Sequence, residues 1–179
     1  AVLANNGIKH KPQIVIGTQD AMTRVMTPLA ADPPVNLGYK PEHVELVRRA
    51  LVGVTQGGTS TRVFASAGYV SAGKTGTAQA VTIGQKDKYN SAKLAEHQRD
   101  HAVYMAFAPA DDPQIALAVI VENAGWGAGV AAPIARRVFD YVLLGKYPSE
   151  EDIAATQVGK STIPIGTQRD AASVPLPGA

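Results

Sequence analysis

The sequence has no cysteine, few aromatic residues, little net charge and no long apolar run. Without cysteine, the chain can form neither a disulfide bond nor a thiolate metal site. Its 17 basic and 15 acidic residues leave a formal net charge of +2, which gives no electrostatic case for nucleic-acid binding. No stretch reaches the roughly 20 apolar residues of a membrane-spanning helix. The chain has 179 residues, 45% of them hydrophobic, and is long enough to bury a core.

Two segments have the apolar periodicity of an amphipathic helix. The first is expected to begin near Pro41, because proline suits the first helical position, and to end at Gly57-Gly58. The second is expected from about residue 131 to 144, with Gly145 as its cap. In this second helix the spacing predicts that Ile134, Val138 and Tyr141 point inward and that Arg136 and Arg137 are exposed.

Three segments are predicted to be strands, at residues 70–81, 102–107 and 115–121, with a tight hairpin turn at 111–113 between the last two. Consecutive antiparallel strands between two amphipathic helices predict an α+β fold, an antiparallel sheet flanked by helices. From residue 147 onward the chain is rich in Pro, Gly, Ser and Ala. We therefore expect one domain over residues 1–146 and a disordered tail over residues 147–179.

Lys74-Thr75-Gly76-Thr77 is the most informative string, because two unrelated chemistries use similar letters. With Gly68 and Gly73, the residues Lys74 and Thr75 satisfy the phosphate-loop pattern Gly-x4-Gly-Lys-[Ser/Thr] of NTPases. A phosphate loop needs a helix that begins at its lysine, whose N–H groups hold the phosphates. The residues after Thr75 favour a strand instead, so a P-loop NTPase is the weaker alternative.

In the strand hypothesis, alternate side chains share a face, so Lys74 and Gly76 point one way and Thr75 and Thr77 the other. Gly76 leaves the backbone open to close approach by a ligand. Such an edge can bind an extended peptide by strand addition, and a lysine nearby adds positive charge for a carboxylate.

The string from Gly73 to Gln79 resembles the third active-site motif of class B penicillin-binding proteins, most of all the elongation-specific subfamily called penicillin-binding protein 2. The resemblance covers roughly residues 1 to 146. It is carried further by segments in matching order: Ala4–Gly7, Lys11-Pro12, Tyr89-Asn90, Lys93–Glu96, Arg99–His101, Ala106–Pro109 and Glu122-Asn123.

This resemblance implies the penicillin-recognising serine transpeptidase fold, similar to that of β-lactamases, of which the chain would be the C-terminal portion. It implies that Lys74 borders the network around the nucleophile, that the hydroxyls of Thr75 and Thr77 bind a carboxylate, and that the Thr77 N–H forms half of an oxyanion hole. Gly76 would keep the strand open. The glycine-rich loop from Glu122 to Gly127 offers two alternatives: it lines the groove with Trp126 in contact with the substrate, or it is a turn with a surface tryptophan.

The two other motifs of the family, Ser-x-x-Lys and Ser-x-Asn, are missing in usable form. The one formal Ser-x-x-Lys joins Ser71 to Lys74, which a strand points to opposite faces, so we expect the nucleophile to lie upstream, outside this chain. His97 and His101, four residues apart and with Asp100 nearby, could suggest a metal site, but the sequence shows no clear further ligand, so no metal is expected.

By the same resemblance, the protein that contains this chain cross-links peptidoglycan stem peptides ending in D-Ala-D-Ala and is acylated by β-lactam antibiotics, with no cofactor. Its partners would be the N-terminal half of the same domain, a SEDS-type glycosyltransferase and other elongation-complex proteins. It would work at the periplasmic face of the bacterial inner membrane, with its anchor outside this chain. A non-catalytic penicillin-sensing or scaffold homologue remains an alternative, which only upstream sequence would separate from the enzyme.

Overall fold

The computed structural model describes residues 1–82, 89–160 and 162–174. The chain forms two compact units, residues 1–47 and residues 48–179. Within the described ranges, no helix is long and apolar enough to cross a membrane.

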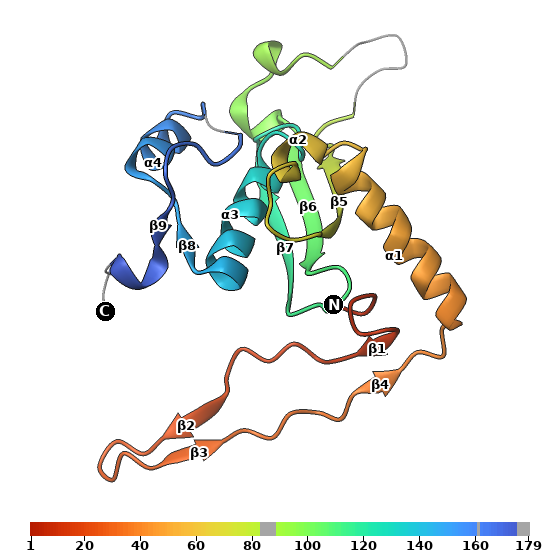
Figure 1. The fold of residues 1–179 in the computed structure, drawn as a ribbon, viewed down its shortest axis with the longest axis vertical. Helices are drawn as coiled ribbons and strands as arrows, with labels where there is room; N and C mark the ends of the chain where they lie inside the picture. Colours follow the sequence, from red (N-terminus) through yellow and green to blue (C-terminus); the bar gives the residue numbers. More distant parts are fainter. Residues whose placement is uncertain (83–88, 161, 175–179) are drawn as a thin grey trace. The chain divides into compact units, whose positions relative to one another are not determined.

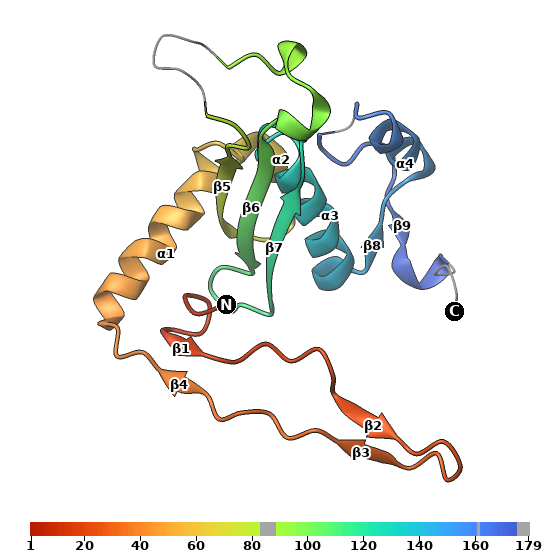
Figure 2. The same cartoon turned by 180° about the vertical axis from the view of Figure 1, so that it is seen from behind.

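The first unit contains an extended antiparallel ribbon (Figure 2). Its strands pair as β1 (Ile8–Lys9) with β4 (Val35–Asn36) and β2 (Gly17–Gln19) with β3 (Met26–Pro28). Asp20 fixes the turn between β2 and β3, because its Oδ1 accepts the N–H groups of Thr23 (2.7 Å) and Met22 (3.0 Å). These hydrogen bonds, that of Thr23 first, hold the pKa of the Asp20 carboxyl below its ordinary value.

The second unit is built on a three-stranded antiparallel sheet in the order β5-β6-β7 (Figure 1). This confirms the predicted α+β sheet and its helices. The elements, from α1 across the boundary between the units to the C-terminal segment, are α1 (Pro41–Gln56), α2 (Thr61–Phe64), β5 (Ala72–Ala78), β6 (His101–Ala108), β7 (Ile115–Val121), α3 (Ala131–Leu144), β8 (Lys146–Tyr147), α4 (Glu150–Gln157) and β9 (Arg169–Asp170), with single 3-10 turns at Ser91–Lys93, Glu96–Gln98 and Ala171–Ser173.

The core lies between the sheet and the helices α2 and α3, and it is rich in alanine. Small residues let α3 approach β6 and β7 closely. Three aromatic rings fill the remaining space: Phe64 stacks on Tyr104 with ring centroids 6.0 Å apart, and Phe139 lies 6.4 Å from Phe64. The alanines and rings together bury the face of the sheet on which Thr75 lies.

The buried face of α3 differs from the sequence prediction. The structure buries Ala131, Ala132, Ala135 and Phe139, whereas Ile134, Val138 and Tyr141 remain about 40% exposed (41%, 38% and 38%). The prediction was wrong because it weighed side-chain size, and contact with the sheet here requires small side chains. The larger apolar residues instead line a groove of about 530 Å³ between α3 and residues 147–159.

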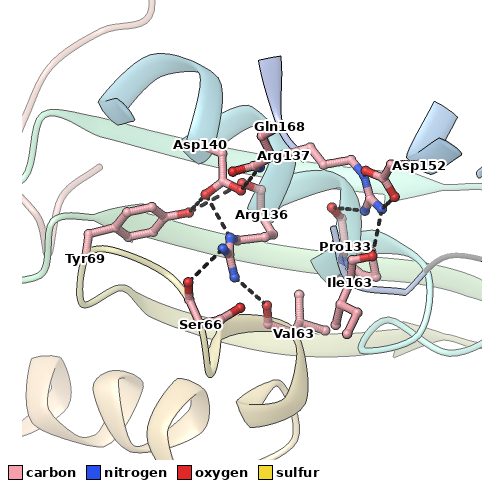
Figure 3. A network of polar contacts seen from close by, with 10 residues as sticks. All are labelled: Val63, Ser66, Tyr69, Pro133, Arg136, Arg137, Asp140, Asp152, Ile163 and Gln168. Carbon is pink, nitrogen blue, oxygen red and sulfur yellow. Dashed lines mark hydrogen bonds and ion pairs between the residues drawn. The ribbon is translucent and has the colours of Figure 1, made fainter. Parts of the chain in front are cut away.

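The prediction that Arg136 and Arg137 lie on an exposed face of α3 was also wrong. Arg136 is buried, and its guanidinium donates to Asp140 Oδ1 (2.8 Å) and to the carbonyl oxygens of Val63 (2.9 Å) and Ser66 (3.2 Å). The guanidinium thus joins α3 to the end of α2 (Figure 3). A buried arginine is tolerated only when its donors are satisfied in this way.

Asp140 carries the network further. Its Oδ1 also accepts the Tyr69 hydroxyl (2.9 Å), and its Oδ2 accepts the Gln168 amide (2.9 Å) (Figure 3). Burial, and after it the Asp140 charge, raises the pKa of the Tyr69 hydroxyl well above its ordinary value. Tyr69 therefore stays a protonated donor.

The segment after residue 147, predicted to be a disordered tail, contains ordered elements among its described residues. Arg137 donates to both carboxylate oxygens of the buried Asp152 (2.6 and 2.9 Å), and this pair holds α4 against α3. Ser149 caps α4 by accepting the Asp152 N–H (3.0 Å), and β8 pairs with β9. Composition did not reveal these contacts, because they join residues far apart in the sequence; residues 161 and 175–179 lie outside the described part.

Replacing Arg136 with alanine should destabilise the second unit by about 3–5 kcal/mol, because Asp140 would keep a buried and incompletely satisfied charge. Urea unfolding measures this difference. The matched control is Arg62→Ala on α2, whose side chain is exposed, and it should change stability by less than about 0.5 kcal/mol. Equal effects of the two changes would contradict a supporting role for the buried network.

Replacing Asp152 with asparagine should release α4 from α3 without unfolding the sheet, because the Arg137–Asp152 pair is the buried charged contact between these two helices. Hydrogen exchange at residues 150–157 should quicken, while exchange in β6 stays slow. Glu151→Gln, at the exposed neighbouring position, is the control and should leave both regions unchanged.

Candidate functional site

The motif string lies on strand β5, as predicted. The register sets Lys74 opposite Met105, Thr75 opposite Tyr104, Gly76 opposite Val103 and Thr77 opposite Ala102. β5 is the last strand on its side of the sheet, and among the described residues no further strand pairs with its outer edge. A backbone edge of this kind can accept an extended peptide.

The motif side chains are divided between the two faces of the sheet. Thr75 lies on the core face and is only 8% exposed. Lys74 is exposed on the opposite face, and its Nζ donates to the carbonyl oxygen of Thr75 (2.6 Å). Thr77, nearer the end of β5, is exposed. The strand therefore presents an ammonium group and a hydroxyl within four consecutive residues.

The corner between α1 and α2 is tied to the sheet by three hydroxyl contacts. Thr55 Oγ1 donates to the carbonyl oxygen of Ser71 (2.7 Å). Thr59 Oγ1 lies 2.8 Å from Thr75 Oγ1. Ser60 Oγ lies 3.3 Å from the Tyr104 hydroxyl. The sequence analysis did not single out this corner, although its cluster of Thr and Ser beside Gly57-Gly58 was a visible signal.

Gly73 has a structural reason that is unrelated to phosphate binding. A Cβ at this position would lie 2.7 Å from Tyr104 Cζ, so a side chain would displace the buried tyrosine ring. Burial raises the pKa of Tyr104 to about 12. The residues after Lys74 continue as a strand, whereas a phosphate loop requires a helix there. The geometry therefore disfavours the NTPase alternative.

The glycine-rich loop after β7 lies directly against the motif strand. The space beside Gly127 is filled by the backbone at Gly76 and Val103, with Gly76 N only 3.2 Å from a Cβ built at Gly127. The Gly125 N–H donates to the carbonyl oxygen of Asp100 (2.7 Å). Trp126, carried on this loop, is 61% exposed. Trp126 is thus accessible to a ligand close to Gly76, and its predicted contact with substrate stays a prediction.

Two other sequence candidates have defined surroundings. Ser71 is buried, and its hydroxyl has no hydrogen-bond partner among the described residues, so it is not placed to act as a nucleophile. His101 Nδ1 accepts the N–H of Asn123 (2.9 Å). Within the described ranges, no three His, Cys, Asp or Glu side chains gather in a way that could hold a metal ion.

The model of the penicillin-binding protein transpeptidase domain matches residues 1–140. The chain belongs to this family. The chain is 36% identical over 171 residues to the peptidoglycan D,D-transpeptidase MrdA of Haemophilus influenzae, and 42% identical over 144 residues to that of Acinetobacter baumannii. These alignments cover 94% and 80% of the chain but 25% and 21% of the relatives.

Solved structures of the same family have the same fold. Penicillin-binding protein 2 of Pseudomonas aeruginosa, solved in complex with WCK 5153, superposes with a TM-score of 0.57 at 33% identity, over 80% of this chain and 28% of that one. Penicillin-binding protein A of Mycobacterium tuberculosis, solved as a ceftriaxone acyl-enzyme, gives 0.61 at 28% identity, over 79% and 30%. The resemblance to the elongation-specific subfamily is confirmed, and the chain spans about a quarter of the length of the curated relatives it matches.

A side chain at Gly127 should push the loop away from the motif strand, because backbone atoms fill the space. We expect Gly127→Ala to destabilise the protein by about 1–3 kcal/mol, seen as a lower Tm. Gly129→Ala is the control, since its Cβ would come no closer than 3.4 Å to the Trp126 ring and 3.6 Å to the Trp126 carbonyl oxygen, which are ordinary contacts. Similar Tm values for the two variants would show that the loop does not depend on this close approach.

Proposed function

We propose that the protein containing this chain is a peptidoglycan D,D-transpeptidase of cell-wall elongation. The observation that carries the proposal is the Lys74–Thr77 string on an accessible edge strand, in a chain of the transpeptidase family. The named relatives are peptidoglycan D,D-transpeptidases, which supports the same reaction class.

In this proposal the chain supplies the strand side of the active site. The Lys74 ammonium adds positive potential beside the nucleophile, and the hydroxyls of Thr75 and Thr77 bind the terminal carboxylate of the stem peptide. The Thr77 N–H donates to the oxyanion that forms on the attacked carbonyl, and one such donor is typically worth about 3 kcal/mol. Gly76 leaves room for the peptide backbone, and Trp126 on the glycine-rich loop contacts the peptide.

The covalent chemistry uses a serine outside these residues. Its Oγ bonds to the carbonyl carbon of the penultimate D-Ala, its proton passes to a base, and the terminal D-Ala leaves as the amine after it gains a proton. An amine of a neighbouring stem peptide then attacks the acyl-enzyme, loses a proton, and releases the serine. The new amide bond is the cross-link, and no cofactor takes part.

β-Lactam antibiotics would acylate the same serine, and the Mycobacterium tuberculosis relative was solved as a ceftriaxone acyl-enzyme. The remaining partners follow from the family: the N-terminal half of the domain, a SEDS-type glycosyltransferase and other elongation-complex proteins. The site of action is the periplasmic face of the inner membrane. A penicillin-sensing homologue would also be acylated, and it differs from the enzyme in not forming cross-links with stem peptides.

Incubation of the longer protein with a labelled penicillin, followed by peptide mass spectrometry, tests this proposal. The expected adduct lies on a serine outside residues 1–179. An adduct on Ser71 would overturn the assignment of the nucleophile, and the absence of any adduct would overturn the proposed function. A stem-peptide cross-linking assay on the same preparation separates the enzyme from the scaffold alternative.

Replacing Thr77 with valine should slow acylation by penicillin about tenfold to a hundredfold, because a hydrogen bond to a charged group is lost. The second-order rate constant of acylation measures the effect. Thr167→Val, an exposed threonine of the C-terminal segment, is the control and should retain the wild-type rate. A Thr77→Val rate equal to that of the control would remove Thr77 from the carboxylate site.

A further inference from the structure

Thr59 is the one member of the hydroxyl corner that faces solvent. The side chains of Thr55 (5% exposed) and Ser60 (0%) are buried, and their contacts with the Ser71 carbonyl and the Tyr104 hydroxyl serve the fold. Thr59 is exposed, yet its hydroxyl lies 2.8 Å from that of Thr75 on the motif strand. Thr59 therefore connects solvent to the buried hydroxyl of Thr75.

Whichever of the two hydroxyls donates to the other, the pair keeps one proton that can bind a ligand. A hydroxyl has one proton to donate and two lone pairs that accept. If Thr75 donates to Thr59, the proton of Thr59 remains free; if Thr59 donates to Thr75, the proton of Thr75 remains free. The two hydroxyls therefore act as one donor unit toward an anion. Without Thr59, the Thr75 hydroxyl would lose the partner that orients it.

The backbone around Thr59 is held in place by its neighbours. The Ser60 N–H and hydroxyl both reach the carbonyl oxygen of Val54 (3.1 Å each). The Thr61 hydroxyl donates to the carbonyl oxygen of Gly58 (2.9 Å). A Cβ on Gly58 would lie 2.8 Å from Val54 Cα, so only glycine allows this close turn. A polar group on such a fixed corner is preorganised for binding.

We propose that Thr59 is a substrate-binding residue, the third hydroxyl of the carboxylate site formed with Thr75 and Thr77. The inference rests on the proposed function, since it gives that site a further residue from outside the motif strand. Thr59 would favour ligands with a free carboxylate and add little for ligands in which that group is esterified.

The test compares a penicillin with its methyl ester on the longer protein, by the second-order rate constant of acylation. Thr59→Val, which keeps the side-chain shape, should lower the rate with the free acid roughly tenfold more than the rate with the ester. Thr59→Ser, which restores a hydroxyl, should recover the preference for the free acid. Thr167→Val is the control and should leave both rates as in the wild type.

The outcomes separate the two proposals. Equal losses with acid and ester would show that Thr59 only supports the fold, and no loss would show that it does not touch the ligand; either result overturns the inference and leaves the proposed function standing. Loss of the preference in Thr59→Ser as well would also contradict the hydroxyl role. A wild-type protein that neither compound acylates would overturn the proposed function itself.

Discussion

The buried guanidinium of Arg136 is the contact on which the arrangement of the second unit depends. It donates hydrogen bonds to the carbonyl oxygens of Val63, in α2, and Ser66, just after it, and it also binds Asp140 on α3. A buried charge of this kind is stable only when every partner is in place. The position of α2 relative to α3 therefore depends on this hydrogen-bonded side chain as well as on the apolar contacts of the core.

The short corner before α2 connects this network to the candidate site. Thr59 and Ser60 directly precede the helix that Arg136 holds, and they meet Thr75 and Tyr104 on the sheet. The glycine-rich loop also contacts the motif strand, because Gly127 allows its backbone to approach Gly76. The motif strand thus contacts two segments whose closeness depends on glycine and on small hydroxyl side chains.

Local patterns in the sequence were sufficient for the elements of the sheet and for the motif. The three strands, their antiparallel order and the helix from Ala131 to Leu144 with its Gly145 cap follow from side-chain period and turn chemistry. The buried face of α3 could not be predicted from these patterns. Its alanines have less apolar area than Ile134, Val138 and Tyr141, yet they are the residues that fit closest to the sheet. Contacts between distant residues, such as Arg137 with Asp152, leave no local pattern, so the helix α4 and the Thr59 corner were not predicted.

A crystal structure of the longer protein acylated by a penicillin would test the central claim most directly, that this strand and corner form a carboxylate-binding site. The account predicts the antibiotic carboxylate within about 2.5–3.0 Å of the Thr75 and Thr77 hydroxyls, with its carbonyl oxygen at the Thr77 N–H. A carboxylate that points away from β5, or an acyl group bound on another side of the sheet, would contradict it.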